Sequence, residues 1–135
     1  MSGEADRKLI LVADDDEDFL NLVTLRLEQD GHRVERASSG SEALRKAREV
    51  DPDLCVFDVM MPGLTGFEVL HELRAQEGTE EMPVMLLTAS LTDREAFDGA
   101  TESAADDWMR KPFSTDEFRA RVRALLGRGE RPDTA

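Results

Sequence analysis

The sequence has a single cysteine, no long apolar run and fewer basic than acidic residues. Cys55 is the one cysteine in 135 residues, which excludes an internal disulfide and fits a reducing cytoplasm. No apolar run approaches the roughly 20 residues that span a bilayer. The chain start, from Met1 to Asp6, shows no basic-then-apolar secretory signal. These absences predict a cytoplasmic protein that does not associate with a membrane.

Acidic residues outnumber basic ones by 30 to 17, so the formal net charge is −13. Such a surface repels phosphate backbones, and we expect no direct binding of nucleic acid by this chain. Hydrophobic residues still make up 40% of the sequence and recur periodically. The composition therefore indicates one globular domain rather than a disordered chain.

Short apolar runs alternate with helical patterns along the chain. The runs predict strands at 9–13, 34–37, 54–57, 83–87 and 107–110. Apolar residues at helical spacing predict helices around 19–27, 43–47, 67–73, 96–100 and 118–126. Five such repeats predict an α/β fold, a flavodoxin-like three-layer sandwich with five helices. Its five-stranded parallel sheet is expected in the order 2-1-3-4-5.

Helix start and stop signals agree with this periodicity. Capping boxes, a hydroxyl residue followed three positions later by glutamate, are expected to begin at Ser39, Thr65, Thr92 and Ser114. Asp16 is expected to cap the first helix and Gly31 to close it. One such match is weak evidence for a helix, but four matches at the places that the periodicity requires are strong evidence.

Polar side chains follow the predicted strands at one edge of the sheet. Asp14 and Asp15 follow the first strand, Asp58 the third, Thr88 the fourth and Lys111 the fifth. Ligands of such sheets bind outside the carboxyl ends of the strands, at the switch point between strands 1 and 3. Closely packed carboxylates repel one another, and a hard divalent cation removes the conflict. Oxygen-only ligands favour Mg²⁺ or Mn²⁺, so the pattern predicts a phosphoryl-transfer site.

Asp58 is the expected nucleophile, because it ends the central strand beside the metal. Attack of a carboxylate on phosphorus gives an aspartyl phosphate. Thr88 can donate its hydroxyl to one phosphoryl oxygen and Lys111 can pair with another. The amide of Ala89 is a further candidate donor.

Together these segments resemble the receiver domain of response regulators, the CheY-like phospho-acceptor half of two-component signalling. The matching stretches are ILVADDD at 10–16, VFDVMMPGLTG at 56–66, LTA at 87–89 and KPF at 111–113. They stand in the family's order and make residues 8–127 the expected receiver domain. Residues 1–7 would be an N-terminal extension, and residues 128–135 a polar tail or the start of a linker.

The resemblance implies how a magnesium ion would be held. Asp15 and Asp58 would bind it directly, together with the main-chain carbonyl of Met60, and Asp14 would act mostly through a water. Met60 also lies two residues after the acceptor, where side chains tune hydrolysis of the phosphate. Because an apolar side chain cannot orient an attacking water, we expect a longer-lived phospho-form than in a Met60→Asn variant.

The resemblance also implies partners and a switch. The donor would be a phosphohistidine on a histidine kinase or a histidine phosphotransfer protein, and the chain would catalyse only its own phosphorylation and dephosphorylation. Thr88 would move toward the phosphoryl group, and Trp108, where Tyr or Phe is usual, would rotate inward behind it. The face of the fourth helix, fifth strand and fifth helix would then engage a downstream effector or a second copy of the chain. The Lys111–Pro112 bond would be cis.

Other functions remain as alternatives. A pseudo-receiver that docks without being phosphorylated would not need the acidic pair together with Thr88 and Lys111. A phosphatase of the haloacid dehalogenase type would place its nucleophile after the first strand, but Asp18 stands where its pattern ends in Thr or Val. An EF-hand loop would need glycine at Phe19 and glutamate at Leu25.

Overall fold

Five parallel strands form the central sheet in a computed structural model of the chain, which describes residues 7–89 and 104–129. They are β1 (Leu9–Ala13), β2 (Arg33–Ala37), β3 (Leu54–Asp58), β4 (Val84–Thr88) and β5 (Asp107–Arg110). Their order is β2-β1-β3-β4-β5, as predicted. β1, β3 and β4 are buried along their whole length, because helices cover both faces of the sheet.

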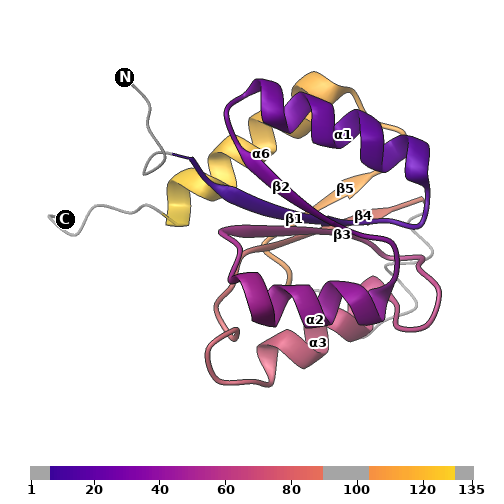
Figure 1. The fold of residues 1–135 in the computed structure, drawn as a ribbon, viewed down its shortest axis with the longest axis vertical. Coiled ribbons are helices and arrows are strands. Elements are labelled where there is room, and N and C mark those ends of the chain that lie inside the picture. The colour runs from indigo at the N-terminus through magenta and orange to yellow at the C-terminus, as the bar shows by residue number, and fades with distance from the viewer. Residues whose placement is uncertain (1–6, 90–103, 130–135) are drawn as a thin grey trace, which may run out of the picture.

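The helices form the two outer layers of the sandwich (Figure 1). One face of the sheet carries α1 (Glu17–Gln29) and α6 (Thr115–Gly129), and the other carries α2 (Gly40–Val50) and α3 (Gly66–Arg74). The described residues thus contain four helices rather than the predicted five. The fourth prediction rested on a weak apolar pattern at Ala96, Phe97 and Ala100, which lies outside the described residues.

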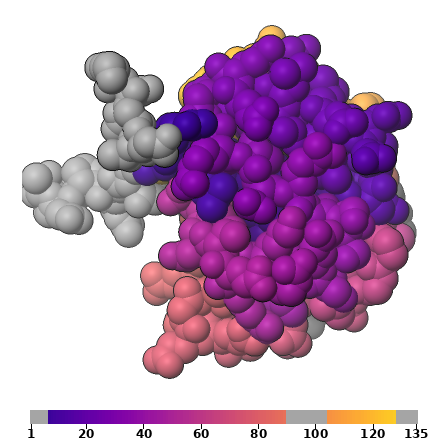
Figure 2. Space-filling view, viewed as in Figure 1, coloured from indigo at the N-terminus to yellow at the C-terminus, as the bar shows by residue number. Residues whose placement is uncertain are grey.

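Alternate residues of the buried strands pack into two separate apolar cores, one on each face of the sheet. In β1, Ile10 and Val12 pack beneath α1 and α6, while Leu11 and Ala13 pack beneath α2 and α3. This alternation is the two-residue period of a strand that is apolar throughout. In the view of Figure 2, segments from the first half of the chain, coloured indigo to magenta, make up most of the surface. None of the described helices is both long and apolar enough to cross a bilayer.

Capping follows the sequence signals wherever the structure describes them. A side-chain oxygen accepts a first-turn amide at Asp16, Ser39, Thr65 and Ser114. At Thr65 the capping box is complete, because the Glu68 side chain in turn accepts the amide of Thr65 at 2.8 Å. Gly31 follows α1 with φ +93°, a left-handed conformation that glycine adopts without steric cost. The signal at Thr92 lies outside the described residues.

Arg74, the last residue of α3, binds the amino ends of β4 and β5. Its guanidinium donates to the carbonyl oxygens of Met82 at 2.7 Å and Ala104 at 3.0 Å. It also pairs with the carboxylate of Asp106 at 3.1 Å. The same carboxylate accepts the amide of Val84 at 2.8 Å. One side chain therefore closes the edge of the sheet opposite to the predicted site.

Candidate functional site

The carboxyl ends of the strands bring the predicted site residues to one edge of the sheet. Ala13 of β1 pairs with Phe57 of β3, so Asp14 and Asp58 lie on neighbouring strand ends. Asp58 in turn pairs with Leu87 of β4, one residue before Thr88.

The fifth strand completes this edge. Thr88 pairs with Arg110 of β5, and the Lys111 amide donates to the Thr88 carbonyl at 2.7 Å. The segments that the sequence analysis grouped by topology are therefore neighbours in space. The Lys111–Pro112 bond is cis, which confirms that prediction.

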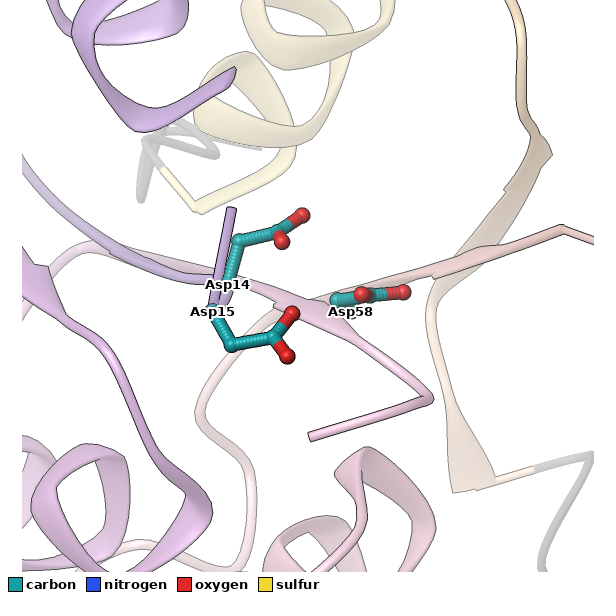
Figure 3. Close-up of side chains that lie close together, drawn as sticks. All are labelled: Asp14, Asp15 and Asp58. Carbon is teal, nitrogen blue, oxygen red and sulfur yellow. The ribbon is translucent and has the colours of Figure 1, made fainter. Parts of the chain in front are cut away.

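Three carboxylates cluster at this edge. Oxygens of Asp14, Asp15 and Asp58 lie within 4.8 Å of one another, and Figure 3 shows Asp14 and Asp15 extending to the same side as Asp58. Asp14 is fully buried, Asp58 is 6% exposed and Asp15 is exposed. Like charges this close repel, and the repulsion is strongest where water is excluded.

Lys111 supplies positive charge to the cluster. Its Nζ lies 2.7 Å from Oδ2 of Asp14 and 3.7 Å from Oδ2 of Asp58. The same Nζ stands 4.3 Å from the centre of the Phe19 ring, a cation–π contact. From the sequence, Phe19 was predicted only as an apolar position of the first helix. The sequence signal that could have indicated this contact is the position of Phe19 on the first helical turn after Asp15, at the end of the helix nearest the site.

The Asp58 carboxyl group is hard to ionise in this environment. Burial first, and then the negative charge of Asp14, raise its pKa from 3.8 to about 6. Lys111 and the amide of Met60, which hydrogen bonds to the carboxylate, act in the opposite direction, and Asp15 adds a further increase. A cation held by this cluster would favour the ionised form, which is the form that acts as a nucleophile.

The backbone around Asp58 is tightly packed against α3. The amide of Val59 donates to the carbonyl oxygen of Leu87 at 2.8 Å, and the amide of Gly66 donates to the carbonyl oxygen of Val59 at 3.0 Å. A Cβ atom at Gly66 would lie only 2.6 Å from the carbonyl oxygen of Asp58. Glycine at this position therefore permits the close approach of α3 to the end of β3. Gly66 closes the segment 56–66 that resembles the family, but this packing role was not predicted from the sequence.

Trp108 lies on β5 away from the carboxylates. Its ring centre is 5.4 Å from that of Phe67, with the planes tilted by 49°. The indole is partly buried against the core beneath α2 and α3. The carbonyl of Trp108 accepts a hydrogen bond from Arg121 of α6 at 3.0 Å. The residue thus connects the two helical layers through β5.

The donor set fits a hard divalent cation. Its side-chain oxygens come from the carboxylates of Asp14, Asp15 and Asp58. Oxygen ligands of this kind suit Mg²⁺, which also keeps several waters and accepts phosphate oxygens. The described residues bring no other group of three such ligands together.

Comparison with known proteins decides the family. The model of the "response regulator receiver domain" family matches residues 10–123. The chain belongs to this family. It is a phosphorylatable receiver of two-component signalling, as the resemblance of its motifs predicted, and receivers are signalling modules rather than enzymes with a separate substrate.

Two curated response regulators illustrate the relationship. The chain is 47% identical over 125 residues to the alkaline phosphatase synthesis transcriptional regulatory protein PhoP of Bacillus subtilis, matching 91% of this chain and 50% of PhoP. It is 43% identical to the transcriptional regulatory protein AfsQ1 of Streptomyces coelicolor, matching 93% of this chain and 54% of AfsQ1. The chain therefore spans about half the length of these relatives.

Solved receiver structures share the fold. The receiver domain of the Francisella response regulator 1452 superimposes with a TM-score of 0.80 at 35% identity, covering 90% of this chain and 98% of that one. TrrA of Thermotoga maritima, in complex with Mg²⁺-BeF, superimposes with a TM-score of 0.78 at 34% identity, covering 87% and 98%.

Proposed function

We propose that Asp58 accepts a phosphoryl group from a phosphohistidine in a Mg²⁺-dependent reaction. The observation that carries this proposal is the position of its carboxylate. It ends the central strand, lies within 4.8 Å of the Asp14 and Asp15 carboxylates, and is 3.7 Å from the Lys111 ammonium. An Asp58 oxygen would form a bond to phosphorus as the phosphorus–nitrogen bond breaks, and the imidazole would leave with that electron pair.

The metal site in this proposal uses Asp15, Asp58 and the main-chain carbonyl of Met60 as direct ligands, with Asp14 acting through a water. Bound Mg²⁺ would neutralise charge on the carboxylates and on the phosphoryl oxygens. The structure of TrrA, the similar protein in complex with Mg²⁺-BeF, contains magnesium. We therefore restrict the proposal to Mg²⁺ and do not extend it to Mn²⁺.

Three groups of the chain would stabilise the transferred phosphoryl group. Lys111, now paired with Asp14, would offer its ammonium to one phosphoryl oxygen. The Thr88 hydroxyl and the amide of Ala89 would donate to others. All three groups lie at or just after the ends of β4 and β5, on the same edge of the sheet as Asp58.

The output in this proposal runs through Thr88 and Trp108 to β5 and α6. A histidine kinase or a histidine phosphotransfer protein would supply the phosphoryl group, and an effector or a second copy of the chain would read the face that includes β5 and α6. The relatives are transcriptional regulators by name, but residues 8–127, with their acidic surface, would not bind nucleic acid themselves. We place the reaction in the cytoplasm, which also suits the single cysteine.

Incubation with acetyl phosphate and Mg²⁺, followed by mass spectrometry of the intact chain, tests the proposal. One phosphoryl group should be added, and none in Asp58→Asn or in the presence of EDTA. An unmodified parent chain would instead support the pseudo-receiver alternative. Steady turnover of a generic phosphate ester, without labelling limited to one group per chain, would favour a phosphatase.

A further inference from the structure

The methionine side chains of the described residues differ strongly in exposure. Met61, Met82, Met85 and Met109 are at most 7% exposed, whereas Met60 is 57% exposed. Oxidation of a thioether follows its access to solvent. A peroxide in solution therefore reaches the sulfur of Met60 before any of these four.

Met60 is also tied to the acceptor. It follows Asp58 by two residues, and its amide hydrogen bonds to the Asp58 carboxylate. Its exposed side chain therefore starts from a backbone segment that lies beside the carboxylate to be phosphorylated. A thioether sulfur is only a weak hydrogen-bond acceptor, so the reduced side chain offers little to hold a water near Asp58.

We infer that Met60 is a reversible oxidation site for peroxides, and that its sulfoxide shortens the life of the phosphate on Asp58. The second half of this inference rests on the proposed function. The sulfur lone pair attacks one peroxide oxygen and the oxygen–oxygen bond breaks. The transferred oxygen gives up its proton to the departing hydroxide, which leaves as water. The sulfur loses two electrons and the peroxide gains them.

The sulfoxide changes the chemistry of the exposed side chain that follows Asp58 by two residues. Its oxygen is a strong hydrogen-bond acceptor where the thioether sulfur was only a weak one, so it can orient a water for attack on the phosphoryl group. Methionine sulfoxide reductases return the side chain to the thioether. The chain would therefore lose its signal faster under oxidising conditions and recover when the sulfoxide is reduced.

Other oxidisable side chains are better protected. Cys55 is fully buried, and burial raises the pKa of its thiol far above the usual range, so it stays in the less reactive protonated form. Trp108 is partly buried against the core. The environment thus makes Met60 the preferred target within the described part of the chain.

The test uses the whole chain and hydrogen peroxide. Peptide mass mapping during a peroxide titration should show one added oxygen on Met60 before any on Met61, Met82, Met85 or Met109. Oxidised and untreated chains are then phosphorylated with acetyl phosphate and Mg²⁺, and loss of the phosphoryl group is followed by intact mass. The oxidised chain should lose it about two- to tenfold faster, the effect of one net hydrogen bond on a rate.

Two variants control this experiment. Met60→Leu keeps Cys55, Trp108 and the buried methionines, so peroxide should leave its own phosphate lifetime unchanged. Met60→Gln carries a polar oxygen without peroxide and should shorten the lifetime in the untreated state. Treatment of the oxidised parent with methionine sulfoxide reductases should restore the original lifetime.

Each outcome has a distinct meaning. Oxidation of the buried methionines as fast as Met60 would overturn the site. A lifetime that is unchanged or longer after oxidation of Met60 would overturn the regulation and leave the proposed function intact. If the untreated chain takes up no phosphoryl group, the proposed function fails together with the lifetime effect, while the peptide map still decides the oxidation site.

Discussion

Replacing Asp58 with asparagine should stabilise the metal-free protein at neutral pH, although Asp58 is the proposed acceptor. The carboxyl group has a pKa of about 6 in the folded chain against 3.8 as its ordinary value. One pKa unit corresponds to about 1.4 kcal/mol, so ionised Asp58 lowers the free energy of unfolding by roughly 3 kcal/mol. Asparagine carries no charge and its side-chain oxygen still accepts the amide of Met60.

The sign of the pH dependence follows from the raised pKa. Between pH 3.8 and about 6 the folded chain binds more protons at Asp58 than the unfolded chain does, so stability falls as pH rises through this window. Below it both states are protonated, and the advantage of Asp58→Asn should disappear. Millimolar Mg²⁺ should also reduce the advantage, because the cation stabilises the parent by mass action.

Urea unfolding in EDTA at pH 7.5 and pH 4, compared with the same measurements in Mg²⁺, checks this prediction. Exposed Asp18, on the first turn of α1, provides the matched control, since Asp18→Asn should change stability little at either pH. The reasoning is refuted if Asp58→Asn is no more stable than the parent in EDTA at pH 7.5. It is equally refuted if an advantage persists unchanged at pH 4.

Three further changes test the site and its surroundings. Mg²⁺ should raise the melting temperature of the parent chain and raise it less in Asp15→Asn; equal shifts in thermal unfolding would argue against a metal held by Asp15. Gly66→Ala should lower the free energy of unfolding by about 1–3 kcal/mol despite the better helix propensity of alanine, because its Cβ would meet the Asp58 carbonyl at 2.6 Å; an equally stable variant in urea would contradict the crowding. Asp30→Asn should destabilise the chain at pH 7, because the Arg119 hydrogen bonds lower the Asp30 pKa below its ordinary value. The stability that this pair contributes is present above pH 3.8 and is lost as pH falls through the folded pKa. A difference in the free energy of unfolding between variant and parent that persists unchanged at pH 3 would contradict the assignment.

The strands and most helices follow from sequence because their signals are local. β1, β3 and β4 are apolar throughout, and parallel strands covered on both faces must be. The predicted strand limits differ from the observed ones by one residue at one end of β2 and of β3, and by one residue at both ends of β4. The predicted fourth helix rested on three apolar residues without a strong period, and its positions lie outside the described residues, which contain four helices.

The grouping of site residues was also predictable, because topology alone brings strand ends together. Their individual environments were not. That Asp14 is buried while Asp15 is exposed depends on how β1 turns into α1. The contact between Lys111 and Phe19 joins residues about 90 positions apart in the sequence, a pairing that no local pattern encodes. The raised pKa of Asp58 likewise requires its burial and its distances from other charges.

The contacts of Arg74 bear on how β5 can respond to events at the site. Its guanidinium fixes the amino ends of β4 and β5 through Met82, Ala104 and Asp106. The carboxyl ends of the same strands carry Thr88 and Lys111. With its amino end anchored, β5 would pivot at Arg74, while its carboxyl end is joined to Thr88 and Asp14 through Lys111. A small displacement at Thr88 would therefore tilt β5 and Trp108 instead of sliding the whole strand along its neighbour.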